Sequence, residues 1–253
     1  MRTFLVCLTA LQLLVSPTLH SAEIPIMSVD QLQRGMKGVG KTVFQGTRIE
    51  EFDVEILGVL RNWNAKSDLI LAKLSGKPGG ALARTGQVIA GMSGSPVYVE
   101  GKLIGAVAYT WSFAKEPIAG ITPIAEMLNV MREGRQEEMG SLPQQIYPLA
   151  SSQTAILVPK EIALANPQVE GLQGATLKPI ATPLVLSGFD SEVIERMAPQ
   201  LAEWGLIPLQ GGGTSAQQPD DLTLEPGSPL GVQLVGGDLN ATGIGTLTYR
   251  RGD

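Results

Sequence analysis

The sequence predicts a mostly β protein with two peripheral helices. Of its 253 residues, 30 are glycine and 17 are proline, and aromatic residues make up only 5%, a composition that favours many short strands and tight turns. Phe52, Val54 and Ile56 alternate with acidic residues, which is the period-two pattern of a half-buried strand. Because hydrophobic residues make up 43% and charged residues 17%, we expect a globular chain rather than a disordered one.

The first 22 residues have the layout of a secretory signal peptide. Arg2 supplies a positive charge, and the apolar run from Thr3 to Val15 is too short to span a bilayer as a helix. The small residues Ser21 and Ala22 follow, so we expect cleavage after Ala22 and export of the remaining chain. The other interpretation of this segment is a short amino-terminal membrane anchor.

Cleavage at this position would remove the only cysteine, Cys7, and the only histidine, His20. The mature chain could then hold neither a disulfide nor a thiolate metal site. No cluster of carboxylates and histidines has metal-ligand spacing, and no glycine loop has the strand and helix context of a phosphate site. We therefore predict no metal and no cofactor. A net charge of -5 without a Lys/Arg cluster argues against nucleic acid as a partner.

Further strands are predicted around one tight turn. Asp68–Leu74 is a nearly continuous apolar strand. Val97–Val99 and Leu103–Tyr109 form a hairpin around the turn Glu100-Gly101. Gly105, inside the second strand of that hairpin, indicates a bulge or a close approach of another backbone.

Two segments have helical spacing, at about residues 122–137 and 191–204. Thr122 can cap the first helix, and Pro123 suits its first turn. The second segment contains Pro199, which should kink that helix.

The second half of the chain is broken by linkers. The Pro/Gln/Ser-rich stretch 141–153 predicts a connection between two regions, and Gly211–Pro219 has the composition of a flexible linker. Val232–Val235 and Gly243–Tyr249 are predicted to be the last two strands.

The segment Gly91-Met92-Ser93-Gly94-Ser95-Pro96 indicates a chemistry. A serine flanked by glycines between two strands can lie on a tight turn with its hydroxyl exposed. The amides of Gly91 and Ser93 could then converge as an oxyanion hole, which needs donors aimed at the charge that develops in the transition state. As a bare pattern, the hexamer is equally compatible with a glycine-rich β-turn without a catalytic role. Ser95 and Pro96 are expected to be structural.

The residues on either side of this loop carry a family pattern. A Gly-Met-Ser-Gly-Ser-Pro loop is followed by a Gly-Lys-x-Ile-Gly-Ala-Val hairpin, a further strand and a helix, and Glu51–Ile56 also matches upstream. Over about residues 24–135 the chain resembles the SpoIVB family of bacterial serine peptidases. The resemblance implies a chymotrypsin-like (trypsin-like) double β-barrel fold, Ser93 as the nucleophile, a peptide or protein substrate, and a place in the periplasm or outside the cell.

This resemblance, together with the linkers, divides the chain into four parts. We expect residues 1–22 to be the signal peptide, and the resemblance implies that residues 23–140 are the serine-bearing half of a SpoIVB-type peptidase domain. Residues 141–153 are the linker, and residues 154–253 form a second β-rich region.

The other two members of a Ser-His-Asp triad do not carry over. Alignment through Lys73-Leu74-Ser75 puts Gly76 where the family has its aspartate, and Asp68 is out of register. The family histidine is expected in a Gly-His pair after a strand that reads Gly-Ile-Gly-Thr-x-Thr-aromatic. Gly243–Tyr249 has this pattern, so we expect the second region to stop before the histidine motif, with the two halves in reversed order relative to the family's sporulation peptidase.

Three hypotheses follow for the chemistry. The first is a serine endopeptidase whose base lies beyond residue 253 or on another chain. The second is a catalytically inactive pseudopeptidase that binds extended peptides in the cell envelope. The third is a dyad of Ser93 with Lys73, Lys102 or Lys115, which would need a buried lysine. The sequence leaves open which of these holds, and it leaves the oligomeric state open.

Overall fold

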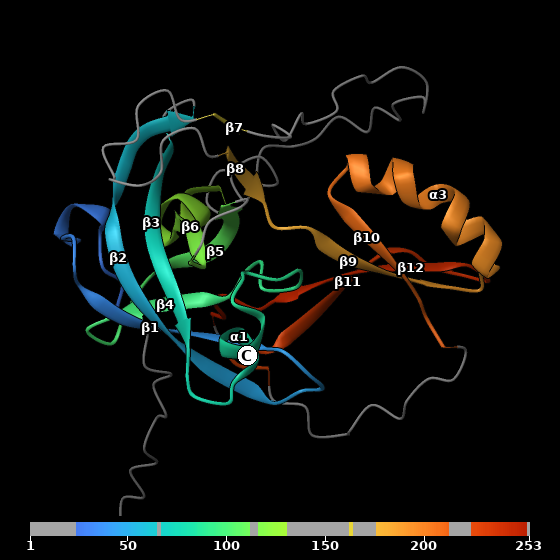
Figure 1. Cartoon of the computed structure of the whole chain (residues 1–253), viewed down its shortest axis with the longest axis horizontal. Helices are drawn as coiled ribbons and strands as arrows, with labels where there is room; N and C mark the ends of the chain where they lie inside the picture. Colours follow the sequence, from blue (N-terminus) through green and yellow to red (C-terminus); the bar gives the residue numbers. More distant parts are fainter. Residues whose placement is uncertain are drawn as a thin grey trace, which may run out of the picture.

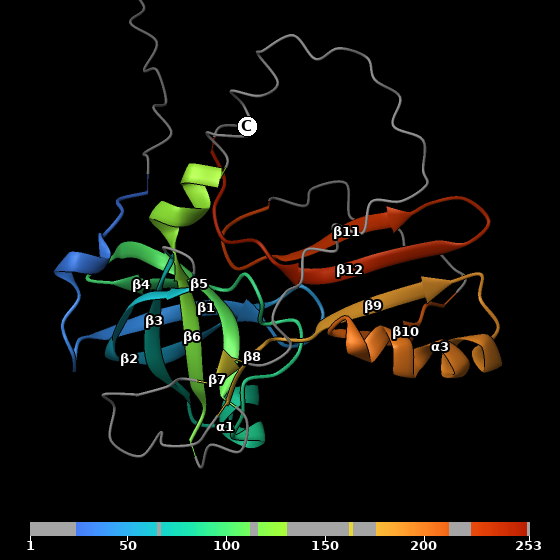
Figure 2. The ribbon, with the colours of Figure 1, turned by 90° about the horizontal axis from the view of Figure 1, so that it is seen from above.

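The computed structural model describes residues 24–64, 67–111, 116–130, 162–163, 176–212 and 224–251. The predicted signal peptide (1–22) and the predicted linker (141–153) lie outside the described residues. Figure 1 shows a β-barrel beside a second sheet that carries one long helix, and Figure 2 shows the same two units from above. Within the described parts of the chain, no helix is long and apolar enough to cross a membrane.

The first unit is a closed antiparallel barrel of six strands. Its strands follow the order β4-β1-β2-β3-β6-β5, and β4 also pairs with β5, which closes the sheet on itself. Two further strands extend this sheet from β5, in the order β8 and then β7. The strands of this unit are β1 (Lys37–Val43), β2 (Ile49–Asn64), β3 (Ser67–Gly76), β4 (Pro96–Val99), β5 (Lys102–Trp111), β6 (Ile118–Pro123), β7 (Ile162–Ala163) and β8 (Thr176–Pro179).

The barrel core is built from the inward-facing residues of these strands. Phe52, Val54 and Ile56 of β2 are buried, and the acidic residues between them are exposed, which confirms the predicted half-buried strand. A fully buried side chain of this size stabilises the fold by roughly 1.5–3 kcal/mol. The other members of the core include Ile70, Ala72, Leu74, Val97, Val99, Ile104, Val107, Ala119 and Ile121. A one-turn 3-10 helix, η1 (Val29–Gln31), and a short helix, α1 (Ala81–Thr85), lie outside the sheet.

The predicted hairpin is present as β4 and β5. Its turn residues Glu100 and Gly101 both have positive φ, 51° and 72°, as a two-residue hairpin turn requires. Gly105 pairs with Val97, and the register shifts immediately after this pair. A Cβ atom at Gly105 would lie 2.0 Å from the carbonyl oxygen of Thr122, so the predicted close approach of another backbone is confirmed.

The first predicted helix begins later than expected. The sequence pattern placed Thr122 at its cap and Pro123 in its first turn, but both residues end strand β6, and the helix begins at residue 124. Thr122 is paired with Ala106 of β5, so sheet pairing overrides its preference for a helix cap. The helix is described as far as residue 130, and residues 131–137 of the predicted range lie outside the described parts.

The second unit is a four-stranded sheet in the order β10-β9-β12-β11. Its strands are β9 (Thr182–Ser187), β10 (Leu206–Gln210), β11 (Pro229–Val235) and β12 (Asn240–Thr246). β9 and β10 are parallel, because helix α3 (Ser191–Glu203) crosses between them. This unit therefore differs from the second barrel that the family resemblance implied: in its described residues it is an open mixed sheet with one helix.

Helix α3 lies close to its predicted position and covers one face of this sheet. Asp190 caps it by accepting a hydrogen bond of 2.8 Å from the amide of Glu192. Ile194 and Leu201 are buried against Leu184 and Leu186 of β9. Trp204, the residue that caps the carboxyl end of α3, is 66% exposed.

The last strand is shifted toward the amino terminus relative to the prediction. β12 covers Asn240–Thr246 rather than Gly243–Tyr249, because its pairing with β9 begins at Asn240 and its pairing with β11 ends at Thr246. After Thr246 the backbone leaves the sheet, and Leu247 exchanges hydrogen bonds with Ser228 and Gly227 (both 2.8 Å). The end of β12 thereby reaches the barrel, where it meets the loop before β4.

Candidate active site

The loop before β4, here called the serine loop (residues 89–95), consists of two consecutive β-turns. The amide of Met92 donates a hydrogen bond of 3.2 Å to the carbonyl of Ile89, and the amide of Ser95 donates one of 3.0 Å to the carbonyl of Met92. Each turn needs a residue with positive φ at its third position, and a glycine stands there in both. Gly91 and Gly94 are therefore three residues apart because each occupies the third position of one of the two turns.

Met92 anchors the serine loop in the barrel. Its side chain is 1% exposed and belongs to the barrel core together with Val97 and Ile104. Ser93 follows at the first central position of the second turn and is only partly buried. The Ser93 hydroxyl has no hydrogen-bond partner among the residues that the structure describes. The loop therefore fixes its backbone from inside the barrel and leaves its serine hydroxyl free.

The backbone amides of the serine loop fall into two groups. The amides of Met92, Gly94 and Ser95 donate to the carbonyls of Ile89, Val107 and Met92 at 3.2, 2.9 and 3.0 Å. The amides of Gly91 and Ser93 have no such acceptor in the described parts of the chain. In residues 91–95 the two amides left without a partner are thus the two that the sequence predicted as oxyanion donors.

Strand β12 and the residues after it hold the carbonyls of the serine loop. The hydroxyl of Thr246 donates to the carbonyl of Gly91 at 3.0 Å, and its amide donates to the carbonyl of Ser93 at 2.9 Å. The hydroxyl of Thr248 donates to the carbonyl of Gly94 at 2.7 Å. Nothing in the local sequence pattern of either segment indicates this contact, because the two segments lie about 150 residues apart in the chain.

Gly94 permits this close packing. Its φ is +88°, and a Cβ atom at this position would lie 2.1 Å from the carbonyl oxygen of Thr246. No other residue type meets both requirements, because a side chain would be strained in φ and would collide with the β12 backbone.

Ser95 has a structural role, as the sequence predicted. Its side chain is 0% exposed, and its hydroxyl donates to the hydroxyl of Thr246 at 3.5 Å. The Thr42 hydroxyl of β1 lies 3.4 Å from the same oxygen. Three buried hydroxyls therefore join the barrel, the serine loop and β12.

Neither carboxylate position supplies a triad aspartate. Gly76, at the position of the family's aspartate, ends β3, and a Cβ atom there would lie 2.2 Å from the backbone nitrogen of Ala83 in α1. Helix α1 thus occupies the space that a side chain would need. Asp68 lies near the opposite end of β3, where its carboxylate accepts from Arg61 at 2.7 Å and from the amide of Asn62 at 3.0 Å.

The lysine candidates for a dyad receive no support. Lys73 forms an ion pair of 2.5 Å with Glu116, and this hydrogen bond raises the pKa of Lys73. A base for Ser93 would need the opposite shift. Lys102 begins β5 at the hairpin turn, and Lys115 lies outside the described residues.

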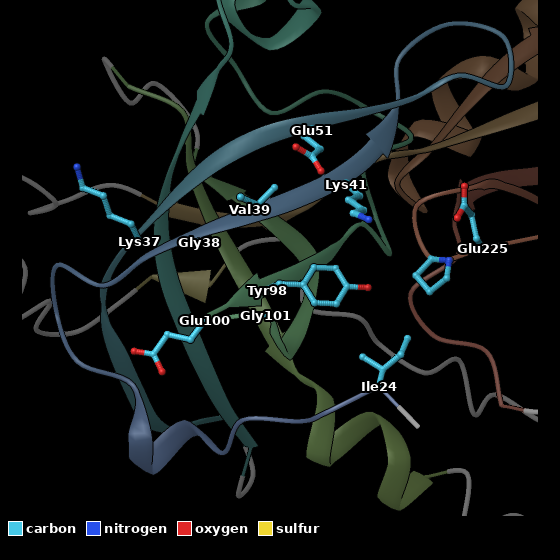
Figure 3. A pocket seen from close by; sticks show the side chains of 11 residues that line it. Ile24, Lys37, Gly38, Val39, Lys41, Glu51, Tyr98, Glu100, Gly101 and Glu225 are labelled. Atoms are coloured by element: carbon cyan, nitrogen blue, oxygen red, sulfur yellow. The ribbon is translucent and has the colours of Figure 1, made fainter. Parts of the chain in front are cut away.

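A pocket of about 530 Å³ lies on the outer face of β1, away from the serine loop, and Figure 3 shows Tyr98 extending across it toward the segment with Glu225. Lys41 lies 5.8 Å from the centre of the Tyr98 ring, and burial raises the pKa of Tyr98. The residues that line this pocket are Ile24, Lys37, Gly38, Val39, Lys41, Glu51, Tyr98, Glu100, Gly101, Glu225 and Pro226. None of them belongs to the serine loop. The described residues contain no group of three or more His, Cys, Asp or Glu side chains that could hold a metal ion.

Comparison with known families identifies the part of the chain that contains the serine loop. The family model described as SpoIVB peptidase S55 matches residues 10–128, just under half of the chain. A search of curated proteins and a search of solved structures each gave no match. The match covers β1 to β6, which form the closed barrel, together with the serine loop. Residues 10–128 of this chain are therefore similar to the SpoIVB family of serine peptidases.

Proposed function

We propose that the protein is an exported serine endopeptidase in which Ser93 is the nucleophile and the amides of Gly91 and Ser93 form the oxyanion hole. One observation carries this proposal. Among the five amides of residues 91–95, these two have no acceptor in the described structure, whereas the other three are hydrogen-bonded.

The chemistry follows from this arrangement. The Ser93 oxygen would attack the carbonyl carbon of a peptide bond, and the substrate oxygen would become an oxyanion that accepts hydrogen bonds from the two free amides. The serine proton would pass to a base and then to the leaving amine, and water would release the acyl group from Ser93 by the same steps. One oxyanion donor contributes on the order of 10²–10³ in kcat, so the two amides supply a large part of the catalysis.

Residues 23–253 contain no histidine that could act as the base. The only histidine of the sequence, His20, lies in the predicted signal peptide. We place the base in other polypeptide, either of the same chain or of a second one. The segment Gly243–Tyr249, which resembles the strand before the family's histidine, lies against the serine loop through Thr246 and Thr248. This contact supports a path along which a histidine would reach Ser93.

The absence of a base favours a second candidate function. With the Ser93 hydroxyl free of any acceptor in the described structure, the same loop could bind extended peptides without cleaving them, as a pseudopeptidase in the cell envelope.

The two functions differ in turnover. The natural full-length protein, purified from its source, would be incubated with an unfolded protein substrate, and the products would be analysed by mass spectrometry. We expect new peptide termini that the Ser93→Ala variant does not produce. Substrate that is retained but remains intact in both proteins would instead establish the peptide-binding function.

A further inference from the structure

We propose that Thr246 and Thr248 are positioning residues for the chemistry at Ser93, so that the second sheet completes an active site whose nucleophile belongs to the barrel. This inference rests on the proposed function. It assigns to the end of β12 the task of fixing the peptide planes on both sides of the Met92–Ser93 peptide and thereby aiming the free amide of Ser93.

Most carbonyls in residues 91–95 of the serine loop are held by the end of β12 and the residues after it. Three of the five carbonyls of residues 91–95 accept hydrogen bonds from Thr246 or Thr248: those of Gly91, Ser93 and Gly94. The other two, of Met92 and Ser95, accept from the amides of Ser95 and Val107. Every carbonyl of residues 91–95 is therefore hydrogen-bonded, and three of the five donors come from Thr246 and Thr248, outside the barrel.

The fixed carbonyls determine the direction in which the Ser93 amide points. In a trans peptide the carbonyl and the amide hydrogen point to opposite sides, and the chain contains no cis peptide bond in its described residues. Fixing the carbonyls of Gly91 and Ser93 on Thr246 fixes the planes on both sides of the Met92–Ser93 peptide. The Met92 carbonyl is in turn held by the Ser95 amide, so the Ser93 amide points out of the turn.

Residue 246 needs a hydroxyl in order to hold the Gly91 carbonyl. Thr246 is 7% exposed, and its hydroxyl has only one proton, which it donates to the Gly91 carbonyl. The hydroxyls of Ser95 and Thr42, at 3.5 and 3.4 Å, lie on its acceptor side. A valine would keep the shape of the side chain but would leave the Gly91 carbonyl without a donor, and that peptide plane would be free to rotate.

Thr42 provides a control that distinguishes the positioning role of Thr246 from the general contribution of a buried hydroxyl to stability. Thr42 is buried in the same cluster of hydroxyls but makes no hydrogen bond to the serine loop among the described residues. Thr42→Val therefore removes a neighbouring buried hydroxyl while it leaves the bond from Thr246 to Gly91 in place. Thr246→Ser retains that bond and removes only a methyl group.

The test compares Thr246→Val, Thr246→Ser, Thr248→Val and Thr42→Val in the natural full-length protein. The first measurement is the rate at which a fluorophosphonate modifies Ser93. We expect Thr246→Val to lower this rate by about 10- to 100-fold, since a small misplacement at a reacting centre has an effect of that size. Thr248→Val is expected to lower it in the same direction. Thr246→Ser and Thr42→Val should stay within about 3-fold of the wild type, a change that corresponds to well under 1 kcal/mol.

The second measurement is amide hydrogen exchange at Met92, Gly94 and Ser95 by NMR, and it does not depend on catalysis. Exchange should accelerate in Thr246→Val and not in Thr246→Ser or Thr42→Val. If the wild type itself is not modified, the proposed function fails, and the exchange rates alone decide the positioning role. Unchanged exchange in Thr246→Val, or equal acceleration in Thr42→Val, would overturn the inference.

Discussion

The hydroxyl of Thr246 donates a hydrogen bond of 3.0 Å to the carbonyl of Gly91, which lies 155 residues earlier in the chain. This bond joins the second sheet to the barrel at the point where the serine loop turns. It is accompanied by the bond from the Thr246 amide to the Ser93 carbonyl and by the bond from Thr248 to the Gly94 carbonyl. The geometry around Ser93 therefore depends on both units of the fold, although the family match covers only the barrel.

Gly94 should tolerate no side chain. In Gly94→Ala, the methyl group would meet the Thr246 carbonyl oxygen at 2.1 Å, and φ would stay at +88°. We expect a loss of more than about 3 kcal/mol in the free energy of unfolding, measured by denaturant titration. Gly101→Ala is the matched control, because its φ is +72° with open space around it, and it should lose only about 1–2 kcal/mol. Equal losses would show that the contact with β12 does not matter.

Restoring an aspartate at position 76 should damage the fold rather than the activity alone. The Cβ of Gly76→Asp would lie 2.2 Å from the Ala83 nitrogen, so helix α1 would have to move. We expect a clear fall in the thermal midpoint of unfolding and no gain in peptide hydrolysis. Ser75→Asp, at the neighbouring exposed position, should lower the midpoint far less, because its new carboxylate is repelled only by Asp53 on the facing strand. A stable and more active Gly76→Asp protein would refute the assignment of this space to α1.

Lys73 should not act as the base for Ser93. Its hydrogen bond with Glu116 raises its pKa, so its amine carries a proton at neutral pH and cannot accept another. Lys73→Met is therefore expected to leave the rate of fluorophosphonate modification at Ser93 within about 3-fold of the wild type. A loss of modification with retained folding, as judged by circular dichroism, would revive the dyad.

The ion pair of Glu51 and Lys77, at 2.8 Å, predicts a pH dependence of stability. Lys77 lowers the pKa of Glu51, first by a hydrogen bond and then by its charge, and Glu51 raises the pKa of Lys77 in the same two ways. A lowered carboxyl pKa gives stability that is lost as the pH falls through the folded-state value. A raised amine pKa gives stability that is lost as the pH rises through its folded-state value.

The difference in unfolding free energy between the wild type and Lys77→Met should thus be largest near neutral pH and should shrink at acid and at alkaline pH. Lys73→Met, which breaks a different ion pair, is the control for the Glu51 titration and should leave the pKa of that carboxyl unchanged. A difference that is constant from acid to alkaline pH would exclude the pair as its source.

Local patterns predicted four of the six barrel strands, β2 to β5, whereas the barrel itself was implied by the family resemblance. Alternation marked β2, the Glu100-Gly101 turn marked the β4–β5 hairpin, and Gly105 marked a close backbone approach. The start of the helix at residue 124 was missed because pairing of Thr122 with β5 outweighs its capping preference.

The second unit was less predictable. A parallel pair such as β9 and β10 depends on contacts that no short sequence window contains, and α3 alone does not reveal which strands it joins. Ser93 and the glycines of its turns could be predicted as a site, because their chemistry and spacing are local. Thr246 and Thr248 could not, since a threonine in a strand has no signature until its partner is known.

The most direct test of the central claim is to locate the adduct that a fluorophosphonate forms with the natural full-length protein. Digestion and mass spectrometry would identify the modified residue. The account predicts one adduct on Ser93, its absence in Ser93→Ala, and no adduct on Ser95, which is buried. An unmodified protein, or an adduct at another residue while Ser93 stays free, would contradict the assignment of Ser93 as the nucleophile.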